Sequence, residues 1–186
     1  EADKWDRELE RVVKTYPSQE WVPAALARQG SIWDTLRTGL YNATKVKLFT
    51  PQVESILTKM ENSGRPDLED KAGAIRDAVR DGYRGRRDRE IEAADTVMVR
   101  HYASAFAFAK KANVRNTQVE KAVRRLAYFT DIIGDAKLKV YVEGTIDPTD
   151  PTKKLEYRDG LYLQSRPGQS ALPANNGNAT SLPVAP

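Results

Sequence analysis

The spacing of the apolar residues constrains the fold of this chain more than any other feature. Up to about Gly134 these residues recur at intervals of three and four, which is the period of an α-helix. The pattern therefore predicts an all-α fold of about six helices, with Trp33, Leu126 and Phe129 in the core. We expect the helices over residues 2–16, 21–40, 51–60, 67–85, 88–111 and 117–134, with Gly82 and Gly85 ending or bending the fourth.

Several of the expected helix ends carry their own signals. Thr50 is placed to cap the third helix, and Pro51 fits the first helical position. Thr117 and Glu120 have the spacing of a capping box, in which a hydroxyl and a carboxylate each bind a free amide at the start of a helix. Gly134 is expected to end the sixth helix.

The first two expected helices indicate how helices pack in this chain. The first has Trp5, Leu9 and Tyr16 on one face. The second contains small residues, among them Gly30, that let a neighbouring helix approach closely. Gly30-x-x-Trp33 is similar to the Gly-x-x-Tyr core of a tetratricopeptide helix. Helix pairs of roughly 30 to 40 residues favour antiparallel hairpins of the pentatricopeptide or tetratricopeptide kind. The alternative is an irregular bundle with small residues at its crossings.

After residue 134 the pattern changes. Leu138, Val140 and Val142 alternate with polar residues, which predicts a short strand or an extended arm. Asp159-Gly160 is suited to a hairpin turn. From residue 167 onward the sequence has no charge and is rich in Pro, Ala, Asn, Gly and Ser, which is typical of a disordered tail. We therefore divide the chain into a helical-repeat domain (1–136), an extended arm or small hairpin (137–163) and a Pro/Asn-rich tail (164–186).

Composition argues against several kinds of chemistry. The chain has no cysteine and a single histidine, His101, which excludes disulfides, thiol catalysis and a cluster of histidine ligands. The carboxylates lie among lysines and arginines at helical spacings, as on solvated helix faces. The longest uncharged apolar run of the helical part, residues 103–109, is too short to cross a membrane. We therefore expect no enzyme activity, no cofactor, no metal and no membrane insertion.

Arg84, Arg86 and Arg87 belong to the densest basic cluster of a chain whose formal net charge is +4. Such a cluster can neutralise phosphates. Acidic residues surround it, however, and no set of aromatic residues for base stacking accompanies it. We therefore predict a solvated corner between helices or a patch that docks an acidic protein surface, and nucleic-acid binding is the weaker hypothesis. The surrounding acids are Asp77, Asp81, Asp88 and Glu90.

Apolar residues in the arm and tail are a second set of candidate contacts. A tail so poor in apolar area cannot recover the cost of ordering itself, about 1–2 kcal/mol per residue. We expect it to lie extended on a partner protein; the alternative is that it packs on the chain's own helices. The candidate contact residues are Tyr157, Leu161, Tyr162, Leu163, Leu172, Leu182 and Val184.

Three stretches, residues 9–37, 50–60 and 122–134, carry a family resemblance, the last through its ending Ala127-Tyr128-Phe129-Thr130-Asp131-Ile132-Ile133-Gly134. In size and helix order the chain resembles the small pentatricopeptide-like extra subunits on the catalytic head of the mitochondrial ATP synthase of euglenozoan protists. The resemblance implies a non-catalytic subunit that binds outside the head, on the ATP synthase α subunit. It also implies a location on the matrix side of the mitochondrial inner membrane.

Two other functions stay open. Residues 21–41 are also similar to periplasmic helical-repeat scaffolds of delta-proteobacteria, which implies a protein-binding role in a bacterial periplasm. A helical repeat can instead bind RNA, but arrays that read RNA use many units with polar specificity residues at fixed positions. This chain offers about three units and no repeating polar pair, so the sequence favours a protein-binding function.

Overall fold

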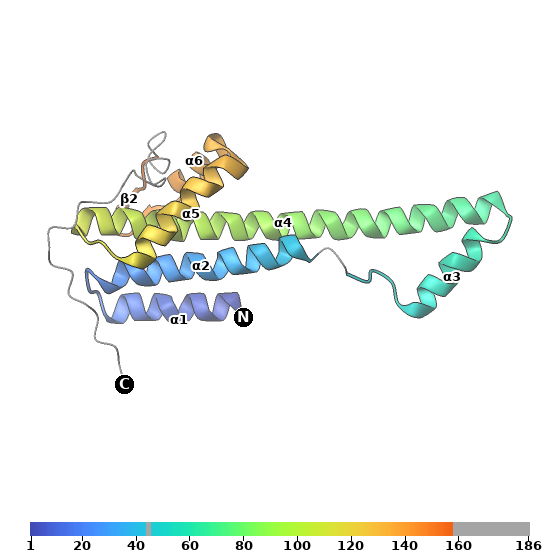
Figure 1. The fold of residues 1–186 in the computed structure, drawn as a ribbon, viewed down its shortest axis with the longest axis horizontal. Helices are drawn as coiled ribbons and strands as arrows, with labels where there is room; N and C mark the ends of the chain where they lie inside the picture. The colour runs from blue at the N-terminus through green and yellow to red at the C-terminus, as the bar shows by residue number, and fades with distance from the viewer. Residues whose placement is uncertain (44–45, 158–186) are drawn as a thin grey trace. The chain divides into compact units, whose positions relative to one another are not determined.

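The computed structural model describes residues 1–43 and 46–157 (Figure 1). This part of the chain contains six α-helices and one two-stranded sheet, which confirms the all-α fold class. The helices are α1 (Ala2–Thr15), α2 (Trp21–Asn42), α3 (Pro51–Glu61), α4 (Pro66–Ala112), α5 (Thr117–Ile133) and α6 (Asp135–Glu143), and the strands are β1 (Ile146–Asp147) and β2 (Asp150–Lys154).

The chain divides into two compact units. One, here called the bundle unit, contains residues 1–35 and, of the described residues, 95–157. The other, here called the hairpin unit, contains residues 36–94. Helices α2 and α4 contribute residues to both units, so each unit is described below by its own contacts.

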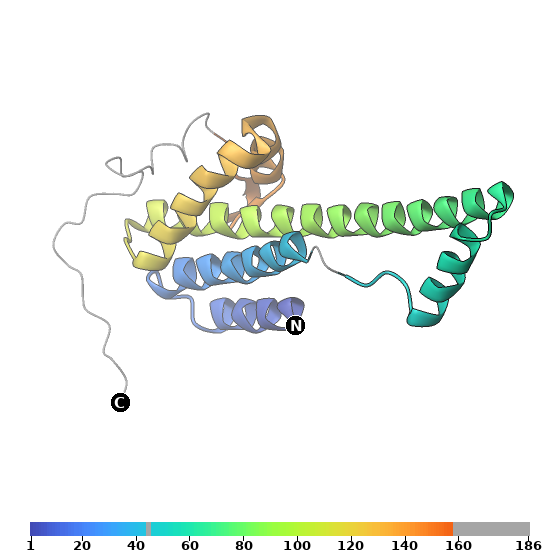
Figure 2. The same ribbon diagram turned by 45° about the vertical axis from the view of Figure 1, so that its right-hand side comes forward.

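The interior of the bundle unit is formed by α2, α5, α6 and the C-terminal part of α4 (Figures 1 and 2). Leu126 and Phe129 of α5 are fully buried, as predicted, and Trp33 of α2 is half-buried against the same core. Burying a side chain of this size contributes about 1.5–3 kcal/mol. The largest fully buried side chains of the described residues are Phe129, Met98, Leu126, Leu138, Val99, Val119, Val123, Val142 and Pro23.

Gly30 marks a close approach between α2 and α4 within the bundle unit. A Cβ atom added to Gly30 would lie 2.4 Å from the Cδ1 of Tyr102, so no other residue fits without displacing the ring. Ala27, one turn earlier in α2, is buried in the same core. The prediction that small residues of the second helix allow a close helix crossing is therefore confirmed.

Two predicted helix ends are confirmed, and one predicted cap is wrong. The Thr50 hydroxyl accepts a hydrogen bond from the amide of Val53 at 3.4 Å, and Pro51 is the first residue of α3. Gly134 follows the last residue of α5 with φ of 81°, a conformation that favours glycine. The capping box is wrong, because the residue that caps α5 is Asn116, whose side chain accepts from the amide of Val119 at 2.9 Å. Glu120 instead pairs with Arg115.

The predicted break between a fourth and a fifth helix is wrong, because residues 66–112 form the single helix α4. Gly82 and Gly85 lie inside it and neither adopts a positive φ. A glycine costs a helix interior only about 1 kcal/mol relative to alanine, and good helix formers surround both. The 67–85 and 88–111 segments therefore do not form a helical hairpin. The pentatricopeptide-like repeat itself stays a prediction.

The strand predicted over Leu138, Val140 and Val142 is also wrong, because these residues lie in α6. Leu138, Tyr141 and Val142 are buried, whereas Val140 is exposed. Burial at positions i, i+3 and i+4 is the helical pattern. Apolar residues of this five-residue stretch also lie two apart, so the sequence alone fits the period of a helix and the period of a strand.

A small hairpin follows α6 within the segment predicted as an arm or small hairpin. Strands β1 and β2 pair antiparallel, with Ile146 opposite Lys154. The chain then returns to the bundle core through Leu155, which is buried and whose amide donates to the carbonyl of Thr145 at 2.9 Å. The predicted Asp159-Gly160 turn and the predicted tail (164–186) lie outside the described residues.

Candidate functional site

Helix α1 lies beside α2 and is fastened to the bundle unit by polar contacts (Figures 1 and 2). None of its side chains is buried. The buried side chain of Gln29 donates from Nε2 to the Asp6 carbonyl at 3.0 Å and to the Asp6 carboxylate at 2.8 Å. The Nε2 of His101 lies 3.2 Å from the same carboxylate. Asp6 therefore joins α1 to both α2 and α4.

His101 is held largely in its neutral form at this contact. Burial lowers the pKa of His101 below its ordinary value of 6.5 and outweighs the nearby carboxylates of Asp6 and Glu10, which act in the opposite direction. A neutral imidazole can still donate one hydrogen bond to Asp6. His101 thus has a structural partner that its sequence context did not reveal, and it serves the packing of α1.

A second polar group joins α2, α4 and α5. Arg125 donates to both carboxylate oxygens of Asp34, from Nε at 2.7 Å and from Nη2 at 2.8 Å. The same guanidinium lies 4.8 Å from the ring centre of Tyr128 and 5.0 Å from that of Phe129. Burial and the neighbouring Asp34 raise the pKa of Tyr102, so this phenol stays neutral. These groups are satisfied by one another, and we assign them to the framework.

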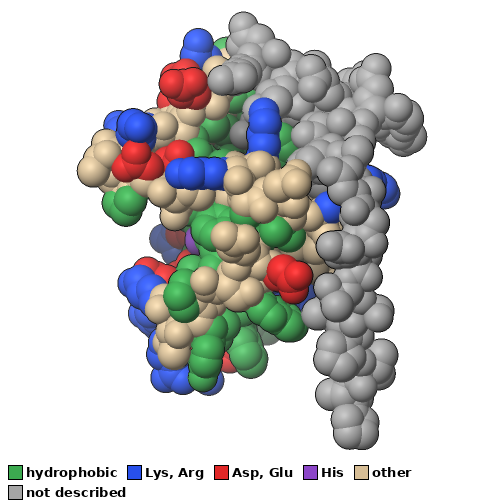
Figure 3. All heavy atoms as spheres, turned by 90° about the vertical axis from the view of Figure 1, so that its left-hand side faces the viewer, with side chains coloured by type: hydrophobic (Ala, Val, Ile, Leu, Met, Phe, Trp, Pro, Cys, Tyr) green, Lys and Arg blue, Asp and Glu red, His purple; other side chains and the backbone are tan. Residues whose placement is uncertain are grey.

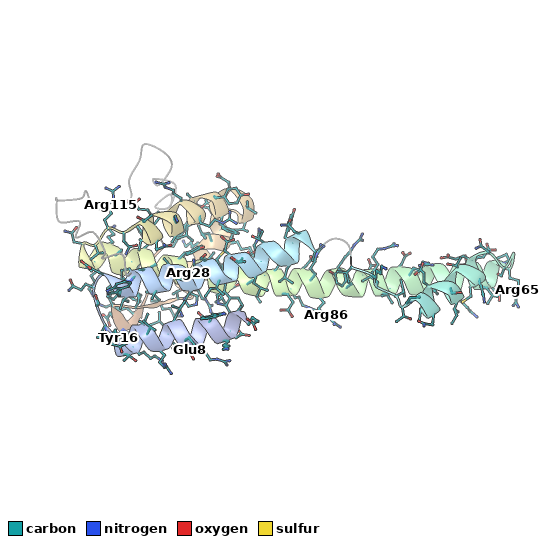
Figure 4. All side chains as sticks on the ribbon, turned by 60° about the horizontal axis from the view of Figure 1, so that its bottom comes forward. Glu8, Tyr16, Arg28, Arg65, Arg86 and Arg115 are labelled. Atoms are coloured by element: carbon teal, nitrogen blue, oxygen red, sulfur yellow. The ribbon has the colours of Figure 1, made fainter. Side chains whose placement is uncertain are left out.

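The outer face of α1 carries an exposed apolar surface. Trp5, Val12 and Tyr16 are 56%, 42% and 67% exposed, and Trp21 at the start of α2 is 55% exposed. Residues at i and i+7 fall on one side of a helix, so Trp5 and Val12 form a stripe on α1, and Tyr16 directly follows its last residue. We call these four residues the aromatic ridge. Figure 3 shows apolar side chains gathered on the lower part of one face of the molecule, and Figure 4 labels Tyr16 at the end of α1.

The ridge residues of the first helix belong to the exposed part of its apolar face. Leu9 and Val13 of α1 are half-buried, whereas Trp5 and Tyr16 are exposed. The sequence correctly placed Trp5, Leu9 and Tyr16 on one face, but it did not identify part of this face as a surface. The sequence did offer one signal for such a surface, namely the presence of Trp and Tyr. These side chains combine a large apolar area with a polar group that tolerates water.

The basic cluster predicted as a docking patch lies on α4 in the hairpin unit. Arg84 is exposed, with its Nη1 3.8 Å from the Oδ1 of Asp81. Arg87 is less exposed and lies 3.4 Å from the carboxylate of Asp88. Arg86 is exposed and projects from α4 in Figure 4. The structure therefore places the three arginines among acidic neighbours on one exposed stretch of helix.

Of the predicted contacts in the arm and tail, only Tyr157 lies within the described residues. It is half-buried against the bundle core, and its hydroxyl donates to the carboxylate of Asp135. The remaining candidates lie outside the described residues: Leu161, Tyr162, Leu163, Leu172, Leu182 and Val184.

Residues 1–43 and 46–157 contain no group of three or more His, Asp or Glu side chains that could hold a metal ion. Over the same residues, no helix is both long and apolar enough to span a membrane. Comparison with known proteins finds no family, no curated protein and no solved structure that matches the chain.

Proposed function

We propose that this protein is a non-catalytic subunit that binds a host protein through the aromatic ridge of α1 and α2. The observation that carries the proposal is the exposure of Trp5, Tyr16 and Trp21 on one well-packed unit. Tryptophan and tyrosine are enriched among the residues that contribute most to protein interfaces, because they bury a large area at a low cost in side-chain entropy.

The way α1 is fastened supports this proposal. Asp6, Gln29 and His101 hold the inner side of α1 through directional hydrogen bonds. Such contacts fix the rotation of the helix about its own axis, which apolar contacts alone do poorly. The ridge is therefore presented in one orientation, and a surface ordered before binding loses less entropy when its partner arrives.

The first host to test is the one that the sequence resemblance suggests. That host is the α subunit of the mitochondrial ATP synthase catalytic head, which would place the protein on the matrix side of the inner membrane. A periplasmic scaffold function would use the same ridge on a different host. The Arg84, Arg86 and Arg87 cluster is proposed as a second contact with an acidic protein surface.

The experiment compares the wild-type chain with a Trp5→Ala/Tyr16→Ala/Trp21→Ala variant in binding to the purified catalytic head. Truncating a central aromatic contact costs about 2 kcal/mol or more, so we expect at least a roughly 30-fold rise in Kd. Tyr41→Ala is the matched control, because Tyr41 is equally exposed and lies in the hairpin unit. It should leave the Kd unchanged.

Two results would count against this function. If the ridge variant keeps its circular dichroism spectrum and binds the host as well as the wild type, the ridge is not the interface. If the chain instead binds RNA at physiological salt and loses this affinity when Arg84, Arg86 and Arg87 are changed to Glu, the RNA-binding alternative is correct.

A further inference from the structure

The α3–α4 hairpin leaves most of its large apolar side chains in water. Among the described residues of the hairpin unit, Leu57 is the one large apolar side chain that is buried. Val53 and Ile56 of α3 are 40% and 58% exposed, and Ile75 and Val79 of α4 are 43% and 38% exposed. We call these four exposed residues the hairpin face. Apolar residues gathered on an exposed surface are typical of a contact site.

The hairpin face lies on one side of the two helices. A short loop joins α3 to α4, so the helices run antiparallel, and the buried Leu57 and Ala72 mark the sides that they turn toward one another. At about 100° per residue, the two exposed residues of α3 are displaced from Leu57 in the same rotational sense as those of α4 are displaced from Ala72. In antiparallel helices the same sense leads to the same side, so the four residues form one surface.

Charged residues of opposite sign lie on different sides of α4. At about 100° per residue over positions 66–94, the charged residues within about 45° of Ile75 are Lys71, Arg86 and Arg89, all of them exposed. The carboxylate nearest in angle, that of Glu90, lies about 60° from Ile75. The side of the helix centred about 120° away from Ile75 instead has only acidic charged residues. These are Asp67, Asp70, Asp77, Asp81, Asp88 and Glu92.

The carboxylates of α3 turn away from the hairpin face. Glu54 and Glu61 both pair with Arg76 of α4, at 2.8 Å and 2.5 Å. Both are displaced from Leu57 in the rotational sense opposite to that of the hairpin-face residues. The hairpin face is therefore bordered by basic side chains, and the carboxylates lie on other sides of the two helices.

We infer that the hairpin face binds the surface of an anionic lipid bilayer. Its four aliphatic side chains enter the boundary between headgroups and acyl chains, as in amphipathic helices that lie in a membrane interface. Lys71, Arg86 and Arg89 reach the lipid phosphates, because long basic side chains extend their stems along apolar surface and keep their charge in the polar layer. The hairpin thus lies on the bilayer without crossing it, in one orientation, with the acidic side of α4 facing the water.

The composition of the face favours a bilayer over an acidic protein surface. Aromatic residues are enriched in the cores of protein interfaces, and the hairpin face has none. Helix α3 contains no aromatic residue. Tyr83, the one aromatic residue of α4 between positions 66 and 94, is half-buried and donates to the carbonyl of Ala43 at 3.2 Å. The basic residues extend from position 71 to 89, about 27 Å of helix, which matches a flat surface (Figure 1).

The hairpin face is separate from the aromatic ridge. It shares only Arg86 with the basic cluster that is proposed as a second protein contact, since Arg84 lies about 180° from Ile75 around α4. Lipid binding therefore does not depend on the proposed function.

The first experiment measures co-sedimentation of the full chain with lipid vesicles at roughly physiological salt. Phosphatidylcholine vesicles with about one third phosphatidylglycerol should bind the chain at least about tenfold more tightly than vesicles of phosphatidylcholine alone. Arg86→Glu/Arg89→Glu should weaken binding to the anionic vesicles at least about tenfold. Arg80→Glu/Arg84→Glu is the matched control, because it makes the same charge change at exposed arginines on other sides of α4. It should weaken binding by less than about threefold.

Fluorescent labels test the orientation of the hairpin on the bilayer. The chain has no cysteine, so Ile56→Cys and Asp81→Cys can each carry a single environment-sensitive fluorophore. On anionic vesicles the emission of the label at position 56 should shift to shorter wavelength and be quenched by brominated lipid. The label at position 81, on the acidic side of α4, should show neither change. Circular dichroism must show that each variant keeps its helix content.

A chain that does not bind the anionic vesicles would overturn the inference, as would equal losses from the two arginine pairs or equal responses of the two labels. Loss of host binding in the Arg86/Arg89 variant, without vesicle binding by the wild type, would assign the face to an acidic protein instead. A chain that binds the vesicles through this face but binds no host through the aromatic ridge would contradict the proposed function alone.

Discussion

At the scale of single residues, Asp6 has the largest part in how the ridge is presented. It accepts from the buried Gln29 and faces His101, while no residue of α1 itself is buried. The position of α1 therefore depends on a few hydrogen bonds as well as on the half-buried Leu9 and Val13. Breaking one partner of such a buried contact leaves the other unsatisfied, which costs about 1–3 kcal/mol.

His101 should make the stability of the bundle unit depend on pH. Because the pKa of His101 is lower in the folded chain than its ordinary value of 6.5, the unfolded chain takes up the proton first as the pH falls. Stability should therefore decrease as the pH drops from about 6.5 through the lowered folded pKa, by at most about 1.4 kcal/mol per pH unit. Urea unfolding of the wild type and of His101→Gln between about pH 7.5 and 5.5 measures this. If the free energy of unfolding depends on pH identically in the wild type and in His101→Gln, the prediction is wrong.

Gly30 is predicted to tolerate no side chain. Gly30→Ala would place its Cβ 2.4 Å from the Tyr102 ring, so we expect a loss of about 1–3 kcal/mol in the free energy of unfolding. Gly39→Ala, also in α2, meets nothing within 4 Å and should be neutral or stabilising by up to about 1 kcal/mol. Chemical denaturation of the two variants gives the comparison. Equal stability of both would show that α2 and α4 do not cross closely at Gly30.

At the scale of elements, local signals predicted helix ends better than they predicted helix continuity. Thr50, Pro51 and Gly134 act through their nearest neighbours, so the sequence identified them correctly. Gly82 is a weak local signal that the long run of helix formers around it overrides. The prediction of a strand in place of α6 is wrong for a different reason. Five residues fit the period of a helix and that of a strand equally well, and tertiary burial selects between the two.

The assignment of α6 gives a prediction that separates a helix from a strand. In the helix Leu138 is fully buried and Val140 is exposed, although both would share one face of a strand. Leu138→Ala should therefore cost about 2–5 kcal/mol, whereas Val140→Ala should change stability by less than about 0.5 kcal/mol. Thermal or chemical unfolding measures both. Losses of similar size would indicate the strand.

At the scale of the whole molecule, the sequence predicted the all-helical fold but not which apolar residues stay exposed. Periodicity identified the apolar face of α1, because spacing reports which residues share a side of a helix. It did not report that only part of this face is buried, since burial is a tertiary property. For the same reason the sequence pointed to Arg84, Arg86 and Arg87, whose charge is visible locally, and passed over Trp5 and Trp21.

The central claim is that the aromatic ridge is covered by a host protein, and hydroxyl-radical footprinting tests it most directly. The chain is labelled alone and within its native assembly, purified at physiological salt, and the oxidation of each aromatic residue is compared. The account predicts that Trp5, Tyr16 and Trp21 are labelled in the isolated chain, as their exposure requires, and protected in the assembly. Oxidation of all three at the same rate in both preparations would contradict it.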